Sequence, residues 1–177
     1  MPRMVRSPAG GAVSFPIVSH PTLGQPPRSL EAGFPAAAAR LRDQRSSIAS
    51  RALEVAVDAD PSIRRRYDDI ALRGILRDAE VLVDRLALCV ASDDTFFLAE
   101  FADQSATVFR RKKVAVMDVM AVLEGIRASA RGVLSEDEVA SADRAIDAAV
   151  AVYKRFHHIR GDARPWNPVT SKLYKGI

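Results

Sequence analysis

Apolar side chains between residues 35 and 161 recur every three or four positions, which is the spacing of one face of an α-helix. No stretch of the chain alternates apolar and polar residues for long enough to predict a β-strand. The clearest helical stripe, between about residues 68 and 90, consists of Leu72, Ile75, Leu76, Ala79, Leu82, Val83, Leu86 and Cys89. The sequence therefore predicts an all-α domain, built either as a globin-like fold or as an antiparallel helical bundle.

Capping and stop signals divide this domain into about five main helices. Ser135 and Glu138 have the S-x-x-E spacing of a capping box, and Gly161 supplies a C-terminal stop. Asp60 stands before Pro61, a pair that marks the start of a short turn. The expected helices cover residues 35–57, 68–90, 94–111, 114–133 and 135–160.

Two features of these helices predict how they pack. Four of the seven phenylalanines lie between residues 96 and 109, so we expect the helix over 94–111 at the centre of the core. Gly74 leaves a gap in the side chains of the helix over 68–90, which predicts the close approach of a neighbouring helix.

The segments on either side of the helical domain have a different composition. Residues 1–34 contain six of the ten prolines and four of the nine glycines, and no helical periodicity, which predicts a disordered tail. Residues 162–177 contain two prolines and the single tryptophan, and we expect an extended peptide there. The chain thus divides into a tail over 1–34, a helical regulatory or sensory domain over 35–161, and a C-terminal peptide over 162–177.

The formal charge of +4 comes from the two terminal segments. Residues 35–161 carry 20 basic and 20 acidic side chains, whereas a domain that binds nucleic acid concentrates positive charge on its folded body. We therefore do not expect nucleic acid as a partner. The basic runs over 64–66 and 110–113 are interpreted as solvated helix ends, unless the fold brings them together as a patch for an acidic partner or nucleic acid.

The chain lacks the residues of a known catalytic or cofactor site. It has one cysteine and three histidines, and no Walker A loop, dinucleotide fingerprint, G-x-S-x-G motif or Glu-x-x-His pair. Cys89 lies on an apolar stripe, which predicts a buried, inert thiol in a reducing compartment. No stretch approaches the ~18 apolar residues of a membrane span. We expect a cytoplasmic protein that is not an enzyme and binds no cofactor and no membrane.

A short motif at the end of the last helix offers a different function. The run His157-His158-Ile159-Arg160-Gly161-Asp162-Ala163 resembles the H-x-[IL]-[KR]-G-x-[AS] stretch of histidine phosphotransfer domains. The resemblance implies that a histidine here accepts a phosphoryl group. Pro165 stops the helix soon afterwards, and the simpler interpretation is two histidines in a last turn, favoured by the helix dipole.

The C-terminal peptide combines aromatic, aliphatic and basic side chains. Such a segment either docks on its own domain or binds a partner through aromatic anchors. The candidate partner-binding residues are Arg164, Trp166, Asn167, Lys172, Leu173, Tyr174, Lys175 and Ile177.

The helical body as a whole is similar to a known sensory module. The pattern comprises Arg45-x-x-Ile48-Ala49, Asp60-Pro61, Tyr67, a long leucine-striped helix, Asp94-x-x-Phe97, Arg110-Arg111 and Asp118-Val119-x-x-x-Leu123-x-x-x-Arg127. Over about residues 40–160 it resembles the N-terminal domain of the RsbR-type co-antagonists of stressosome signalling. The resemblance implies an all-helical, globin-like fold without haem and a regulatory or sensory role, often as a dimer. Family members usually continue into a second domain such as a STAS domain, so we expect output through association.

These observations lead to one main hypothesis and two alternatives. The main hypothesis is a non-enzymatic regulatory or adaptor protein, expected to be a homodimer, that binds protein partners through its C-terminal peptide or its helix surfaces. The first alternative is a histidine phosphotransfer protein that uses His157 or His158. The second is a small-molecule or cofactor-binding sensor with a pocket among the phenylalanines of residues 96–109.

Overall fold

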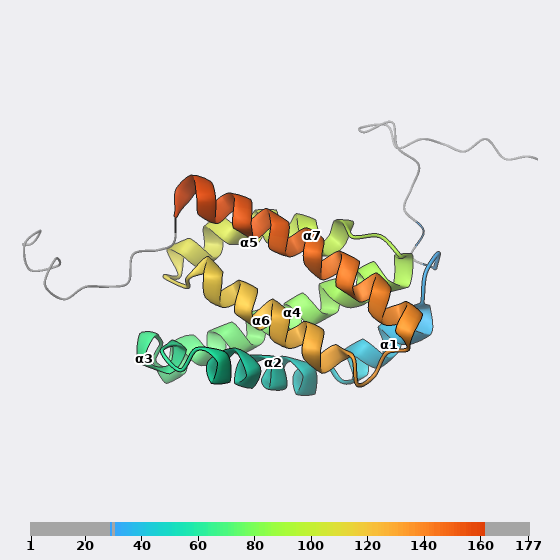
Figure 1. Cartoon of the computed structure of the whole chain (residues 1–177), viewed down its shortest axis with the longest axis horizontal. Coiled ribbons are helices and arrows are strands. Elements are labelled where there is room, and N and C mark those ends of the chain that lie inside the picture. Colours follow the sequence, from blue (N-terminus) through green and yellow to red (C-terminus); the bar gives the residue numbers. More distant parts are fainter. Residues whose placement is uncertain (1–28, 30, 162–177) are drawn as a thin grey trace, which may run out of the picture.

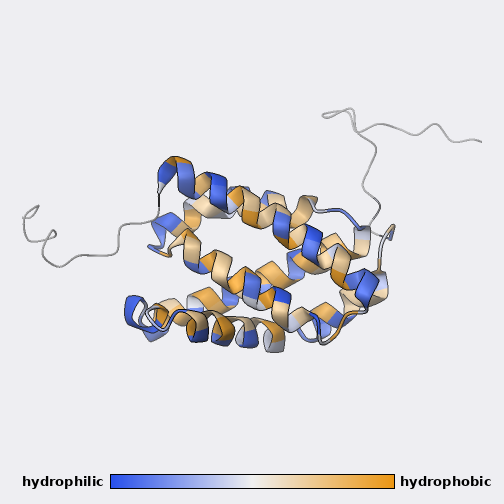
Figure 2. Ribbon diagram, viewed as in Figure 1, coloured by the Kyte–Doolittle hydropathy of each residue, from blue (hydrophilic) through white to orange (hydrophobic). Residues whose placement is uncertain are grey.

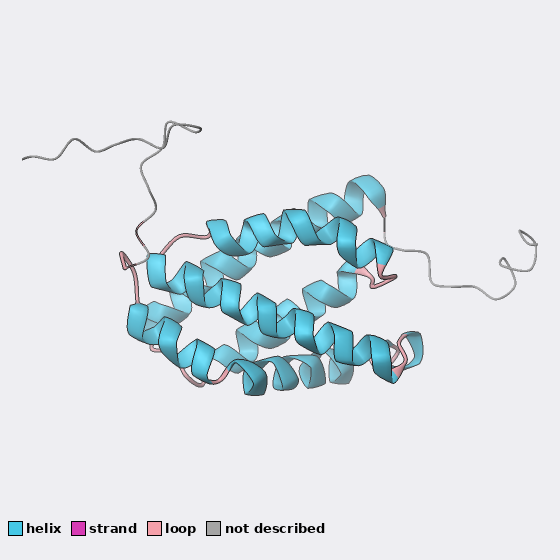
Figure 3. Ribbon diagram, turned by 180° about the vertical axis from the view of Figure 1, so that it is seen from behind, coloured by secondary structure: helices cyan, strands magenta, loops and turns pink. Residues whose placement is uncertain are grey.

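The computed structural model describes residue 29 and residues 31–161, and all regular structure within them is helical (Figure 3). The tails expected over 1–34 and 162–177 therefore lie mostly outside the described residues, together with all eight candidate partner-binding residues, from Arg164 to Ile177. The seven helices of the described part are α1 (Pro35–Asp43), α2 (Arg45–Ala59), α3 (Ile63–Arg66), α4 (Asp69–Ser92), α5 (Phe96–Arg111), α6 (Val116–Ala130) and α7 (Glu136–Arg160).

The helix expected over 35–57 consists of two helices. The backbone bends at Gln44, which has φ −101° and ψ 13°. The two helices differ in their neighbours, since α1 packs mainly against α4, and α2 packs against both α4 and α6. The bend allows Leu41 and Ile48 to be buried in the same core.

Consecutive long helices run in opposite directions, so α5 and α7 run in the same direction (Figure 1). Their register is set by one side-chain contact between them and by a second from α7 to Asp93, which caps the end of α4 just before α5. Ser141 Oγ donates to Asp93 Oδ1 at 2.6 Å, and the hydroxyls of Ser105 and Tyr153 lie 2.8 Å apart. The two residues of each pair are 48 positions apart in the sequence. An offset that stays constant along two segments means that the segments run in the same direction. The C-terminal ends of α5 and α7 therefore lie at the same end of the bundle.

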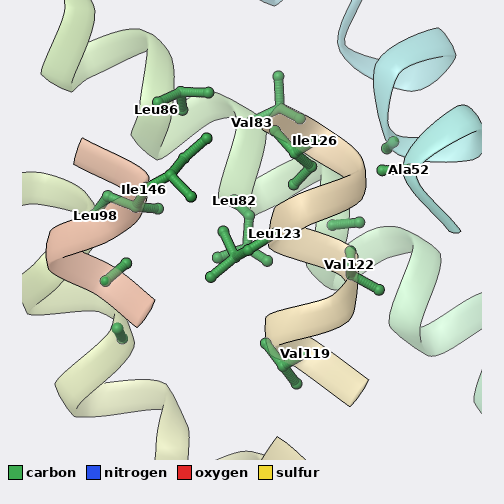
Figure 4. Packing of buried hydrophobic residues seen from close by; sticks show 14 of the residues in the cluster. Ala52, Leu82, Val83, Leu86, Leu98, Val119, Val122, Leu123, Ile126 and Ile146 are labelled. Carbon is green, nitrogen blue, oxygen red and sulfur yellow. The ribbon is translucent and has the colours of Figure 1, made fainter. Parts of the chain in front are cut away.

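Each helix carries both hydrophobic and hydrophilic residues (Figure 2). The core is mainly aliphatic, and its side chains meet between the helices (Figure 4). Leu82, Leu86, Leu98, Leu123, Ile126 and Ile146 are all 0–1% exposed. The helix expected at the centre of this core, α5, does pack into it, but its phenylalanines contribute little. Only Phe109 is buried, while Phe96, Phe97 and Phe101 are half-buried. The remaining buried positions of α5 are Leu98, Ala102, Ser105 and Ala106, and α7 packs against this largely small-residue face.

The close approach expected at Gly74 occurs instead at Gly125. A Cβ atom at Gly74 would meet nothing within 4 Å. A Cβ atom at Gly125 would overlap the carbonyl oxygen of Ala52 and lie 2.8 Å from its Cα. Gly125 therefore allows the backbones of α2 and α6 to touch.

The helix ends confirm most of the capping signals. Ser135 and Glu138 form the expected capping box, and Asp68 accepts a hydrogen bond from the Ala71 amide at the start of α4. Gly161 ends α7 with φ 64° and ψ 173°, a backbone conformation that favours glycine. None of the described helices is both long and apolar enough to cross a membrane.

Candidate functional site

The register of α5 and α7 brings two basic segments together. Extending the offset of 48 positions to the end of α5 places Arg110 level with His158, and Lys112 level with Arg160. In Figure 1 the ends of both helices and the turn from α5 to α6 lie at one end of the molecule. The basic run over 110–113 and the last turns of α7 thus share a surface.

Tyr67 joins a third basic segment to this surface. Its hydroxyl donates to Asp118 Oδ2 at 2.6 Å and accepts a hydrogen bond from the amide of Ala115 at 2.8 Å. Tyr67 directly follows the basic run over 64–66, and Ala115 lies two residues after Lys113. The fold therefore brings together the basic runs over 64–66 and 110–113, a convergence that the sequence left open. We call residues 58–73, 110–118 and 154–161 the basic end.

The basic end concentrates the positive charge of an otherwise neutral domain. It contains eleven basic and five acidic side chains, whereas the rest of residues 35–161 contains nine basic and fifteen acidic ones. The two parts thus carry formal charges of +6 and −6. Several of these cations are exposed and make no ion pair among the described residues: Arg64, Arg65, Arg110, Arg111, Lys113, Lys154 and Arg155.

Exposed apolar side chains gather at the same end. Ile70 is 73% exposed, Met117 50% and Ile159 70%, and all three belong to the basic end. Val108, which is 43% exposed, precedes it by two residues. Exposed apolar side chains beside unpaired cations are more typical of a binding surface than of an ordinary solvated surface.

One cation of the basic end, Arg66, is held in a polar network. Its Nη2 lies 2.6 Å from Asp118 Oδ1 and 2.8 Å from Asp60 Oδ2, and it also donates to the hydroxyl of Ser62. Asp118 is only 6% exposed, and it accepts the bond from Tyr67 as well. The network therefore joins α3 to the first turn of α6.

The pKa values in this network lie far from neutral pH. Hydrogen bonds from Ser62 and from Arg66 lower the pKa of Asp60 to about 2. The bond to Asp60 raises the pKa of Arg66, and burial raises the pKa of Tyr67 to about 12. These three groups keep one protonation state near pH 7, which suits a structural clamp better than acid–base catalysis. Asp60, Tyr67 and Asp118 are also part of the pattern on which the family resemblance depends.

A groove opens between α2, α3 and α4 beside the basic end, which contributes two of its lining residues, Arg64 and Leu72. Leu53 and Val57 of α2 and Leu72 and Leu76 of α4 form its apolar walls. Ser50, Glu54 and Arg64 complete the lining, and the volume is about 220 Å³. Sequence reasoning missed this groove, because an apolar stripe does not show which of its side chains remain uncovered.

The remaining sequence candidates lie as follows. His157 is half-buried and His158 exposed in the last turns of α7, and the guanidinium of Arg160 stacks on Phe156. A second space touches one phenylalanine of the expected pocket, Phe109, but its volume is only about 10 Å³. That volume is about what one water molecule needs.

Cys89 is confirmed as a buried thiol. It is 0% exposed, and its sulfur accepts a hydrogen bond from the Leu98 amide at 3.3 Å. Burial raises its pKa to about 11, so the reactive thiolate is scarce at neutral pH. No group of three or more His, Cys, Asp or Glu residues in the described part of the chain is arranged to hold a metal ion.

Fold and site together define an all-helical protein with a strongly basic, partly apolar end. No protein-family model matches the chain, and a comparison with curated proteins finds no relative.

Proposed function

We propose that the chain is a non-enzymatic regulatory or adaptor protein of the cytoplasm, which acts through association with a protein partner at its basic end. The observation that carries this proposal is the separation of charge between the basic end and the rest of the domain. A surface with net charge +6 attracts acidic partners over long distances and disfavours basic ones. The C-terminal peptide follows directly after Gly161, which belongs to this end. Its sequence contains Trp166 and further cations that can take part in binding.

The family resemblance supports the regulatory role. RsbR-type sensory domains are globin-like, often dimeric and without catalytic activity, and the same fold and a homodimer are part of this proposal. A two-fold contact that joined two copies through their basic ends would bring charges of the same sign together. We therefore place the dimer contact away from the basic end, which leaves this end open to the partner.

A crosslinking pull-down from native lysate tests the proposal with the full chain as bait. The test variant carries Arg110→Glu and Arg111→Glu, a second variant carries Trp166→Ala, and Arg42→Glu is the control. Arg42 is also exposed and without an ion pair among the described residues, but it lies on α1. We expect one major protein to be lost with the double variant and retained with the control. Equal capture by all baits, or nucleotide turnover by the purified chain, would contradict the proposal.

Histidine phosphotransfer is the second candidate, favoured by one observation. His158 is exposed, and the register places it level with Arg110, where a cation would stabilise a phosphoryl group. Incubation with acetyl phosphate would then give an acid-labile phosphate that is lost in His158→Gln and kept in His157→Gln. If neither histidine is labelled, this candidate is excluded.

A further inference from the structure

The groove between α2, α3 and α4 has the form of a pocket for a single anchor side chain. Its walls are the side chains of Leu53, Val57, Leu72 and Leu76, all from the facing sides of two antiparallel helices. Arg64 lies at its rim, exposed and without an ion pair among the described residues. From this combination we infer that the groove receives a large aliphatic or aromatic side chain from an acidic segment of the protein partner.

The size of the groove favours a side chain over a small-molecule ligand. Pockets for cofactors and drug-sized ligands usually occupy about 300–1,000 Å³ and enclose most of the ligand. The groove has only about 220 Å³ and is open along one side. Binding hot spots commonly consist of one aromatic or aliphatic anchor in such a recess, with polar contacts around it.

The charges around the groove favour acidic neighbours for that anchor. Glu54, the one acidic residue of the lining, is already paired with Arg51 at 3.0 Å. Arg73 and Arg77 follow Leu72 and Leu76 in the sequence, so the helical repeat places them as a parallel stripe along the exposed side of α4. The same repeat places the exposed Asp69 on this stripe, one turn before Arg73. Together with Arg64, the stripe forms a cationic border that carries three cations and one carboxylate, and its positive excess can pair with carboxylates beside the anchor.

Other anionic partners fit this arrangement less well. The phosphates of a nucleic acid bind cations, but they gain nothing from an aliphatic groove, and the exposed side chains that stack on bases in single-strand sites are aromatic. A lipid surface is nearly flat on the scale of one side chain, whereas the four aliphatic side chains line a recess. A protruding side chain on a peptide satisfies both the recess and the cationic border.

A synthetic peptide tests the inference directly. The probe is a short fluorescent peptide of glutamates with one central tryptophan, titrated with the full-length protein by anisotropy. One control peptide replaces tryptophan with alanine, and another replaces glutamate with lysine. We expect each change to weaken binding about tenfold or more, because both the anchor and the charges contribute.

Two pairs of protein variants locate the binding site. Ser50→Trp fills the groove from its exposed lining, whereas Ser47→Trp adds the same side chain one turn earlier on α2, outside the lining. Arg64→Glu reverses the rim charge, and Arg42→Glu makes the same change on α1. We expect about a tenfold loss of affinity with Ser50→Trp and with Arg64→Glu, and little change with either control. All four sites are exposed, so the variants should keep the fold, which circular dichroism checks.

The outcomes separate this inference from the proposed function on which it depends. If Ser50→Trp and Ser47→Trp bind the probe equally, or if the tryptophan peptide does not bind, the groove is not the anchor site. Tighter binding of a single-stranded oligonucleotide or of phosphatidylserine vesicles would likewise overturn the peptide partner. The proposed adaptor function fails separately, when the basic-end variant captures the same proteins from lysate as the unchanged chain.

Discussion

At the scale of single residues, two helical glycines have opposite consequences for stability. Gly125→Ala places a methyl group against the backbone of Ala52, and rigid backbone cannot move aside without separating α2 from α6. We expect a loss of about 1–3 kcal/mol in the free energy of unfolding. Gly74→Ala meets open space, so it should add up to about 1 kcal/mol through helix propensity. Urea denaturation of both variants measures the difference, and equal effects would contradict the contact.

These two glycines also show where sequence reasoning stops at this scale. Both stand inside long helices, and from the sequence alone the close contact is expected at Gly74. Periodicity identifies the buried face of a helix, but it does not show which point of that face crosses another backbone. That point depends on the crossing of α2 and α6, which is a property of the assembled fold.

The lowered pKa of Asp60 predicts how the free energy of unfolding changes at acidic pH. Its pKa of about 2 in the folded protein lies below the ordinary value of 3.8, so the folded state favours the carboxylate. The resulting stabilisation is present above about pH 4 and is lost as the pH falls towards 2. We expect the urea midpoint of the unchanged protein to fall over this interval, and that of Asp60→Asn to fall less.

The control for this experiment is Asp58→Asn. Asp58 is an exposed neighbour with no ion pair in the described part of the chain, so its variant should follow the unchanged protein. Asp93 and Glu138 also have lowered pKa values, because of hydrogen bonds from the Ser141 side chain and the Ser135 backbone. Some acid dependence therefore remains in Asp60→Asn. If Asp60→Asn loses stability as steeply as the unchanged chain, the network around Arg66 does not form in solution.

At the scale of helices, the register between α5 and α7 is the contact that builds the basic end. Ser105 and Tyr153 are both buried, and their hydroxyls bond only if the two helices lie in this register. A double-mutant cycle with Ser105→Ala and Tyr153→Phe tests it by chemical denaturation. We expect each single variant to lose about 1–2 kcal/mol, since it leaves a buried polar group without its partner.

The double variant should lose less than the sum of the single losses. A coupling of about 0.5 kcal/mol or more is typical of residues in direct contact. Strictly additive losses would show that the two hydroxyls do not meet, and the basic end would lose its main structural support.

The sequence predicted the all-helical class and the capped helix ends better than it predicted the break within a helix. The capping box at Ser135 and the stop at Gly161 are local signals, because the groups that satisfy the backbone lie within a few residues. The break at Gln44 has no such signal, since neither glycine nor proline stands there. It arises because α2 packs against α6 as well as α4, whereas α1 packs mainly against α4, and this information is not local.

At the scale of the whole molecule, net charge concealed the candidate site. The 20 basic and 20 acidic residues of the helical domain balance, so their count alone predicts a neutral body. The runs over 64–66 and 110–113 were visible, but whether they converge depends on the direction of each helix. Parallel α5 and α7, with Tyr67 tied to the start of α6, convert a neutral composition into a charged end.

The length of the molecule makes this charge separation effective in solution. The 25 residues of α7 span about 37 Å at 1.5 Å per residue, whereas the Debye length is about 10 Å in 0.1 M salt. An acidic partner near the basic end is therefore screened from most of the negative charge at the far end. Its association rate should depend on where a basic residue lies, and not only on the net charge of the protein.

Arg111→Glu and Arg42→Glu separate position from net charge. Both residues are exposed and without ion pairs among the described residues, and both variants lower the net charge by two. We expect Arg111→Glu, at the end of α5, to slow association of the acidic tryptophan peptide severalfold in low salt, with little change for Arg42→Glu. Stopped-flow anisotropy measures both rates, and the difference should shrink as salt is added. Equal slowing by the two variants would mean that the peptide responds to total charge, and the basic end would lose its role as a steering surface.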